Sequence, residues 1–564
     1  MSSENKNKNK NKHQGQQQDQ EQRQSPNVVA AASIVDVGEH PEESAGEEWQ
    51  SVSEKQGVAG RETKQHPAQT EQVGLAEIGA NASDRKHTVS ARIAAHFAEL
   101  LKKPGPDNRL QSPLKLLRLS PKQAYTFSVA FLGWMVDAID FFCVSMTTTE
   151  LAASFDTDPS NITSAITVTL MLRPIGALVF GIIGDRYGRR IPLMVNLFLF
   201  TIIELASGFA HSLPTFVGLR AVYGILMGGE WGLGNSLAME TLPVESRGIF
   251  SGILQEGYAV GNLVAAMLYY AIVPSLGWRA LYWISIAPAA VTIVLSYFLD
   301  ETDAWKQARQ SQRDSAKKYH QVVLDMLKRH WLRCIYAIIL LAAMNFLSHG
   351  SQDLYPTFLK KQHGFSPKQA TIGTVVGNLG AIVGGMFFGY MSGYFGRRRT
   401  IIICVICGSC FIPLWILPNK FGQLLAGAFF MQVFVQGAWG VIPVYLSEIS
   451  PEGFRTTFPG LSYQLGNLIS ASASQIEATM GEKNPLPELR DGQKVPNYGR
   501  VQGILIGIIY CCVFVLIILG REEHGKQFGQ YTKSIDQGIG EDDDNGSHGY
   551  RDSHISLKSA EHKV

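Results

Sequence analysis

Apolar residues along this chain gather in long runs separated by short polar or charged connections. Each run is about 18–25 residues long, the length at which an α-helix crosses the hydrocarbon core of a bilayer. Six runs precede a long charged connection and six follow it. They cover residues 125–148, 162–184, 191–210, 214–238, 249–273, 278–299, 333–356, 369–392, 399–417, 420–446, 454–478 and 500–520. The pattern predicts an all-α membrane protein with twelve transmembrane helices in two six-helix bundles.

The same pattern divides the chain into five segments. Both ends are polar and charged, with Asn-Lys repeats and a Gln-rich stretch near the N-terminus and an acidic cluster near the C-terminus. Such segments bury too little apolar surface to fold, so we predict disordered tails. The predicted segments are an N-terminal tail (1–120), a first bundle (121–300), a connecting loop (301–332), a second bundle (333–520) and a C-terminal tail (521–564).

Basic residues concentrate in the middle connection and in two short turns. The connection carries eight Lys or Arg residues between 306 and 333, and the turns 186–190 and 397–399 carry three arginines each. Lys360 and its neighbour Lys361 lie on the opposite side but are outnumbered. Because loops rich in Lys and Arg stay in the cytoplasm, we expect these connections and both tails to be cytoplasmic.

Composition excludes several classes of protein. The chain has 564 residues, 46% of them hydrophobic, and its formal net charge of +2 decides little about partners. We expect no nucleic-acid partner. All seven cysteines lie in apolar runs, so we expect no disulfides. The sequence contains no His-Glu-x-x-His metal motif and no evident pair of nucleophile and base. We therefore expect no metal, no cofactor and no enzymatic activity.

The two arginine-rich turns belong to an internal repeat. Gly181–Arg190 reads Gly-Ile-Ile-Gly-Asp-Arg-Tyr-Gly-Arg-Arg, and Gly389–Arg398 reads Gly-Tyr-Met-Ser-Gly-Tyr-Phe-Gly-Arg-Arg, at an offset of 389 − 181 = 208. The same offset relates Trp231-Gly232 to Trp439-Gly440, Glu240 to Glu448, Pro243 to Pro451 and Arg247 to Arg455. One offset over so long a stretch predicts a duplication, with two related bundles packed about an axis along the membrane normal.

We expect the repeated turns to form gating or scaffold elements rather than a substrate site. Glycines permit a tight turn and close helix approach, a carboxylate can accept hydrogen bonds from a helix N-terminus, and arginines can bind helix ends and lipid phosphates. The candidate residues are Gly181, Asp185, Arg186, Gly188, Arg189, Gly396 and Arg397. Gly393 replaces the acid in the second copy, so we expect the halves to be gated differently.

The seventh run ends with five polar residues on one helical face. They are Asn345, Ser348, His349, Gln352 and Asp353, within an arc of about 140° at 100° per residue. Such groups are costly in hydrocarbon unless they face protein or a water-filled cavity. We interpret them as part of a pathway for solute and protons; the alternative is polar contact between helices.

The offset of 208 places two carboxylates at the matching positions of the first run. They are Asp137 (345 − 208) and Asp140 (348 − 208). Like charges this close repel, so we expect one of them to bind a proton readily; the alternative is a pair held by basic partners. Arg173, deep within the second run, is the candidate carboxylate-binding residue, unless it forms a permanent ion pair with one of these acids. Asn467 is a further candidate for substrate contact.

These residues resemble a known family of membrane transporters. Gly181–Arg190 is similar to the signature between helices 2 and 3 of the major facilitator superfamily. The seventh-run signature of the fungal Jen-type carboxylate–proton symporters reads Asn-x-x-Ser/Thr-His-x-Ser/Thr-Gln-Asp-x-x-x-Thr. Its specified positions are filled here by Asn345, Ser348, His349, Ser351, Gln352, Asp353 and Thr357.

The resemblance implies twelve helices around a central cavity, alternating access, and import of a short-chain monocarboxylate (lactate, pyruvate, acetate or propionate) with a proton across the plasma membrane. We expect a proton on the His349/Asp353 or Asp137/Asp140 pair to precede carboxylate binding by Arg173, Gln352 and Asn345, with the proton gradient as the energy source. Ser348 and Asn467 complete the expected substrate site.

Two alternatives remain open at this point. One is a malate- or succinate-transporting member of the same family, and the other is a nutrient sensor that signals through its long tails. The lysines of the tails also suit ubiquitin ligases or arrestin-type adaptors as partners, beside the substrate, protons and the lipid bilayer.

Overall fold

A computed structural model of the chain describes residues 111–528, apart from 315–318, 488 and 491–492, together with isolated residues between 94 and 100. Most of both predicted tails lies outside the described residues. The described part is helical except for one short hairpin, in which β1 (Leu489–Arg490) pairs antiparallel with β2 (Gln493–Lys494).

The first half of the chain forms six spans. Its helices are α3 (Pro121–Met146), α4 (Thr148–Ser154), α5 (Pro159–Tyr187), α6 (Arg190–Gly208), α7 (Leu213–Thr241), α8 (Arg247–Gln255), α9 (Gly257–Ile284) and α10 (Ile286–Tyr297). A capping box starts α3, because Ser120 and Gln123 each accept a hydrogen bond from the other's backbone N–H. Gly277, with a φ of 79°, breaks α9. The fifth span is therefore α8 with the first part of α9, and the sixth is the rest of α9 with α10.

The second half repeats this plan. Its helices are α12 (Tyr319–Gln352), α13 (Tyr355–Thr357), the π-helical turn η1 (Phe358–Gln362), α14 (Pro367–Phe395), α15 (Arg397–Ile416), α16 (Phe421–Trp439), α17 (Ile442–Ile449), α18 (Thr457–Ser470), α19 (Ala473–Lys483) and α20 (Tyr498–Leu519). The tenth span joins α16 to α17, and the eleventh joins α18 to α19.

Nine helical segments of the described chain are long and apolar enough to cross a membrane. One of them, Arg247–Tyr297, contains two spans. The remaining two spans are α7 and the pair α18–α19, whose sequences are rich in glycine and polar residues. The prediction of twelve transmembrane helices is confirmed.

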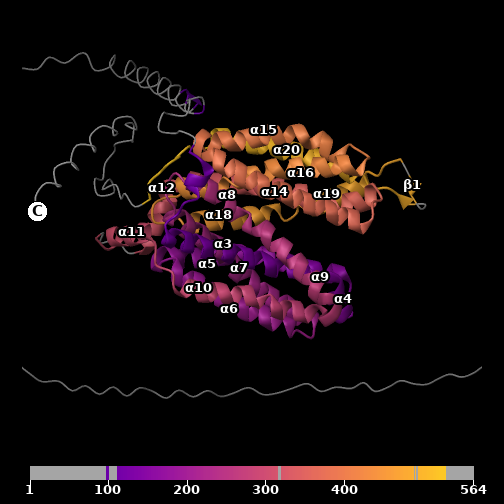
Figure 1. Ribbon diagram of the computed structural model, residues 1–564, viewed down its shortest axis with the longest axis horizontal. Coiled ribbons are helices and arrows are strands. Elements are labelled where there is room, and N and C mark those ends of the chain that lie inside the picture. Colours follow the sequence, from indigo (N-terminus) through magenta and orange to yellow (C-terminus); the bar gives the residue numbers. More distant parts are fainter. Residues whose placement is uncertain are drawn as a thin grey trace, which may run out of the picture. The chain divides into compact units, whose positions relative to one another are not determined.

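The two halves of the chain form separate groups of helices, coloured indigo to magenta and orange to yellow in Figure 1. Here, the arginine side is the membrane side that carries the turns 186–190 and 397–399, and the far side is the opposite one. Figure 1 shows α11 (Asp303–Asp314) at the arginine side and α4 and β1 at the far side.

Three segments differ from the predicted loop and tails. The connection 301–332 contains α11 and the first turns of α12. Before α3, the short helix α2 (Pro113–Leu116) is held by Ser246, whose hydroxyl donates to the Leu116 carbonyl at 2.9 Å. After α20, the chain packs on the bundles as far as Phe528, whose ring lies 3.7 Å from the Arg247 guanidinium. The carboxylate, aromatic and apolar groups of these segments therefore bind the bundle ends, although their overall polarity predicts disorder.

The segment after α20 also closes the start of α15. The Glu522 carboxylate accepts hydrogen bonds from the backbone N–H groups of Arg397 (3.0 Å) and Arg398 (2.9 Å), which are unpaired within their own helix. Burial raises the pKa of Glu522 despite these bonds. Burial and the nearby Arg397 guanidinium lower the pKa of His524 to about 4, so this imidazole is neutral at neutral pH.

Two helix crossings join the bundles, α5 with α18 and α8 with α14. Both run through glycines. A Cβ atom at Gly181 would lie 2.8 Å from the Cα of Thr457, and one at Gly252 would overlap the carbonyl oxygen of Gly385. Absent side chains thus let the backbones of the two bundles touch on the arginine side.

We expect Gly252→Ala to destabilise this contact by about 1–3 kcal/mol, because the added methyl group meets backbone that cannot rotate away. Gly218, also helical, has open space around its Cα, so Gly218→Ala is the matched control. Thermal unfolding of both variants in detergent measures the difference. Equal melting temperatures for the two variants would contradict the tight α8–α14 contact.

Candidate functional site

A cavity lies between the bundles and takes its lining from both. Its wall comes from α3, α5, the α8–α9 junction, α12, α14, α16 and α18. The centres of water molecules can reach about 60 Å³ of it. At roughly 10–15 Å³ for each water, this is room for about four to six waters or a small organic molecule.

The internal repeat is visible in the cavity wall. Phe141 and His349 line it from opposite halves (349 − 141 = 208), as do Arg173 and Ala381 (381 − 173 = 208). In each pair one half supplies a charged or titratable group and the other an apolar one. The duplication therefore places matching positions of both bundles on the cavity wall. The side chains at these positions differ, so the guanidinium of Arg173 and the imidazole of His349 come from different bundles.

Arg173 on α5 is 2% exposed and points into the cavity wall. Its guanidinium carbon lies 4.9 Å from the centre of the Phe141 ring, and Nη2 donates to the sulfur of Met227. Among the described residues no carboxylate lies within 4.0 Å of it, and its Nε has no acceptor. The permanent ion pair with Asp137 or Asp140 is therefore not observed. A buried guanidinium without a carboxylate is suited to binding an anion.

His349 on α12 joins the cavity to a carboxylate. Its Nδ1 lies 3.0 Å from Asp353 Oδ2, and its Nε2 lies 3.0 Å from Asn467 Oδ1. Both oxygens are acceptors, so this arrangement suits an imidazolium that donates from both nitrogens. If the Asn467 amide turned over, its N–H would instead donate to a neutral ring. The Asp353 side chain is 42% exposed and contacts the cavity only through His349.

Amides and hydroxyls form the rest of the polar wall. Gln352 Nε2 donates to Gln432 Oε1 at 2.8 Å, and Gln436 Nε2 donates to Ser348 Oγ at 3.2 Å. The Asn345 side chain lines the cavity while its Nδ2 donates to the Leu341 carbonyl at 2.9 Å. These groups can hydrogen-bond to substrate oxygens without adding charge.

Sequence reasoning missed the two glutamines of α16. Gln432 and Gln436 stand four residues apart in an apolar run, which places them on one helical face. That spacing was a usable signal, of the same kind as the polar face of α12. Of the two, Gln436 lines the cavity and Gln432 supports Gln352 from behind it. Asn262 and Asn378, which line the cavity too, are polar residues of the fifth and eighth runs that sequence reasoning did not select.

Asp137 and Asp140 do not line the cavity, contrary to the expectation that they converge there with His349. They are 0% and 1% exposed, and their carboxylate oxygens have no hydrogen-bond partner among the described residues. The cavity side of α3 is occupied instead by Phe141 and Phe142. The first bundle also contains an ion pair between Arg220 Nη2 and Glu204 Oε2 at 2.6 Å, and neither Asp137 nor Asp140 takes part in it.

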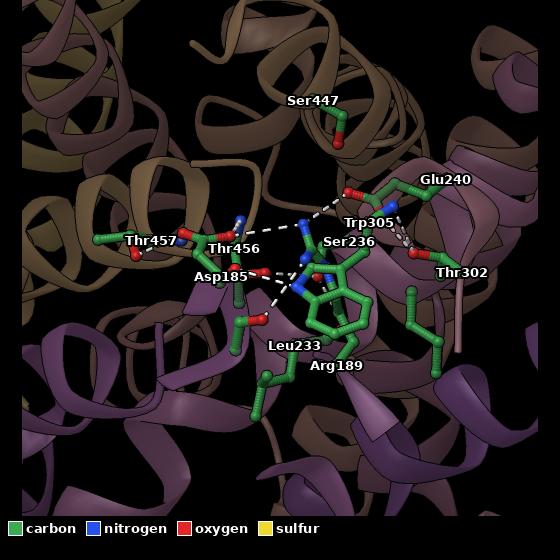
Figure 2. A network of polar contacts seen from close by, with 12 residues as sticks. Asp185, Arg189, Leu233, Ser236, Glu240, Thr302, Trp305, Ser447, Thr456 and Thr457 are labelled. Atoms are coloured by element: carbon green, nitrogen blue, oxygen red, sulfur yellow. Dashed lines mark hydrogen bonds and ion pairs between the residues drawn. The ribbon is translucent and has the colours of Figure 1, made fainter. Parts of the chain in front are cut away.

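The arginine side of the bundle interface is closed by the Asp185 carboxylate (Figure 2). Oδ1 accepts from the backbone N–H of Thr456 at 3.0 Å, and Oδ2 accepts from the N–H and hydroxyl of Thr457 at 2.9 and 2.6 Å. These N–H groups begin α18, so a negative charge from the first bundle caps a helix of the second.

Arginines connect this cap to neighbouring carboxylates. Arg189 Nη2 lies 3.5 Å from Asp185 and 2.8 Å from Glu240. Figure 2 shows Arg189 between these two carboxylates. In the second bundle Arg397 donates to both oxygens of Glu448 at 3.0 Å. Gly393 stands where Asp185 stands in the first copy, so the cap between bundles has no counterpart there.

The remaining residues of the repeated turns have local roles. Gly188 and Gly396 have φ values of 107° and 92°, which other residues rarely adopt. The Arg186 guanidinium lies over the rings of Tyr187 and Tyr319, at 5.0 and 5.3 Å from their centres. These contacts shape the turns and lie apart from the cavity.

Comparison with known proteins agrees with this architecture. Residues 124–522 match the family model "Sugar (and other) transporter". A "Carboxylic acid transporter protein homolog" of Saccharomyces cerevisiae is 34% identical over 435 residues, which are 73% of this chain and 70% of that protein. The "Cis,cis-muconate transport protein" of Acinetobacter baylyi is 27% identical over 358 residues, 63% of this chain and 86% of that protein.

The fold is also that of a solved transporter. The proton:xylose symporter XylE, of the major facilitator superfamily, superimposes with a TM-score of 0.58 at 20% identity, covering 72% of this chain and 98% of its own. The chain therefore belongs to the sugar (and other) transporter family of the major facilitator superfamily, and it is a multi-pass membrane transporter rather than an enzyme.

Proposed function

We propose that the protein imports short-chain monocarboxylates such as lactate, pyruvate, acetate or propionate together with protons. The observation that carries this proposal is Arg173, a buried guanidinium on the cavity wall without a carboxylate partner. The substrate carboxylate supplies the missing negative charge. The name of the yeast relative, a carboxylic acid transporter homolog, supports the same class of substrate.

The size and polarity of the cavity favour a small acid with one charge. Room for about four to six waters suits an acid of a few carbons. Gln352, Gln436 and Ser348 offer hydrogen bonds to its remaining oxygens, while Arg173 provides the fixed positive charge. A dicarboxylate would need a second cation, for which the wall offers only the imidazole of His349.

The His349–Asp353 pair is the proposed proton site for coupling. Asp353 is partly exposed and His349 lines the cavity, so a proton taken up by the pair places positive charge beside the substrate site. An anion then binds more strongly to the protonated cavity than to the neutral one. No cofactor is needed, since the proton gradient supplies the energy.

We infer that the arginine side faces the cytoplasm of a cell whose plasma membrane holds the protein, with both tails on that side. The described state, whose bundles pack on the arginine side, is then the outward-facing one. Rocking of the bundles about the cavity would break the Asp185 cap and release substrate and proton inside. The tails, which lie outside the described residues, are the proposed sites for ubiquitin ligase or arrestin-type adaptors.

Uptake of labelled lactate into cells lacking other carboxylate permeases tests the proposal. We expect saturable uptake that rises at acidic external pH and collapses with a protonophore, because a proton must accompany each anion. Strong competition by succinate and malate would indicate a dicarboxylate transporter. Absence of uptake at normal surface expression would contradict transport and favour a sensor.

Arg173→Gln tests the anion site. Loss of the guanidinium, which can make two hydrogen bonds to a carboxylate, is expected to remove about 2 kcal/mol or more of binding free energy. This corresponds to a KM increase of roughly 30-fold. Arg500→Gln, at an exposed arginine near the start of α20, is the matched control. A KM for lactate that stays at the wild-type value in the Arg173 variant would rule out this residue as the anion ligand.

Asp185→Asn tests the closure of the arginine side. The amide has one acceptor oxygen instead of two and lacks the negative charge that stabilises the N-terminus of α18. We therefore expect a larger fraction of the molecules to be open on the arginine side. Ser236→Cys reports on this, because Ser236 contacts Thr456 across the interface at 3.0 Å. In a background without the exposed native cysteines, a thiol reagent applied from the arginine side should label this cysteine severalfold faster. Unchanged labelling would argue against the cap.

A further inference from the structure

Glu256 forms the floor of the cavity at the point where the bundles cross. It lies between α8 and α9, with φ −72° and ψ −6°, and its side chain is 4% exposed. The chain of α8 runs from the arginine side up to this residue, so Glu256 separates the cavity from the closed interface.

The side chain of Glu256 lies directly on the backbone of the other bundle. A Cβ atom at Gly385 of α14 would overlap Glu256 Oε1, so the glycine provides the space that the carboxyl group occupies. Oε1 is buried and has no hydrogen-bond donor among the described residues. By contrast, the carboxylates of Asp185 and Glu448 near the bundle interface bind arginines and backbone N–H groups.

No charged group neutralises Glu256. Across the cavity the titratable or charged residues are Arg173, His349 and Tyr463, and Arg247 and Tyr258 lie on α8 and α9 themselves. The helices that pack around α8 and the start of α9 carry Lys122, Tyr125, Asp137, Asp140 and Cys143 on α3, Glu150 on α4, Arg190 and Glu204 on α6, Arg220, Tyr223, Glu230 and Glu240 on α7, Lys368, Tyr390 and Tyr394 on α14, and Tyr445 and Glu448 on α17. None of them forms a hydrogen bond or ion pair with Glu256 within the described structure. If the carboxylate were ionised, its Oε1 would be buried against α14 without a donor, which is unfavourable.

The internal repeat shows what the position accepts. Its counterpart in the second half is Gln464 (464 − 256 = 208) on α18, the helix that crosses α5. Gln464 is buried, and its Oε1 is likewise without a donor among the described residues. One bundle crossing thus contains a neutral amide, and the other contains an acid of the same shape that fits when it is protonated.

Resting on the proposed function, we propose that Glu256 is a second proton-binding residue of the transport cycle, protonated while the arginine side is closed. Loss of its proton places a charge against the α14 backbone at Gly385, which weakens the α8–α14 crossing. Opening admits water to the carboxylate and stabilises the charge. Proton release from Glu256 would then favour the state that is open to the cytoplasm. Glu256 therefore acts by positioning α8 against α14.

Cysteine labelling at Ser236→Cys tests the inference without any substrate. With Glu256 present, the labelling rate from the arginine side, divided at each pH by the rate of free cysteine with the same reagent, should rise severalfold as pH increases from about 6 to about 8, because ionisation opens the crossing. The division removes the rise that comes from the thiolate fraction itself. Glu256→Gln, which keeps the shape and cannot ionise, should remain slowly labelled across this range. Glu256→Asp should restore a pH dependence that a purely structural role would not provide.

Two controls separate the outcomes. Glu150→Gln changes an acid of the far-side helix α4 and should leave the labelling profile unaltered, and Asp353→Asn should retain the rise that depends on Glu256. A Glu256→Gln protein whose labelling follows pH as in the wild type, or a wild type without pH dependence, overturns the inference. Failure of lactate uptake in the wild type would instead overturn the proposed function, since the labelling assay requires no transport.

Discussion

The cost of holding charge inside a membrane protein is the constraint on which this structure depends. Asp185 and Glu448 meet that cost with arginines and backbone N–H groups, which join helices together on the arginine side. Arg173 does not, because it lies in the cavity wall without a carboxylate. The compensated charges stabilise the scaffold, and the uncompensated guanidinium leaves binding energy for an anion that arrives from outside.

The duplication explains how a single cavity acquires opposite chemistry on its two sides. Both halves supply the same helices at the same offset, yet the counterpart of Arg173 is the apolar Ala381, and the counterpart of His349 is Phe141. Anion binding and proton binding are thereby placed on different bundles. When both sites are loaded, the bound anion on one bundle and the bound proton on the other attract each other. This attraction acts between the bundles, where a change of access must be controlled.

Much of this architecture could be predicted from the sequence, because the length of the apolar runs and the repeat offset of 208 can be recognised without knowing any tertiary contact. The spans, the repeated turns and the polar face of α12 follow from them. The orientation of α3 could not be predicted in this way. Helical spacing places Asp137 and Asp140 on one face, but the neighbour that this face meets is decided by tertiary packing, which turns Phe141 and Phe142 to the cavity. Glu256 gains its meaning only from its contact with Gly385, a residue distant in the chain.

The most direct test of this account is calorimetric titration of the purified protein with lactate in buffers of different ionisation enthalpy. The account predicts that lactate binds with uptake of protons from the buffer, and that the uncharged analogue lactamide does not bind measurably. Binding of lactamide as tightly as lactate, or lactate binding without proton uptake at any pH, would contradict the claim that a charged carboxylate and a proton are bound together in this cavity.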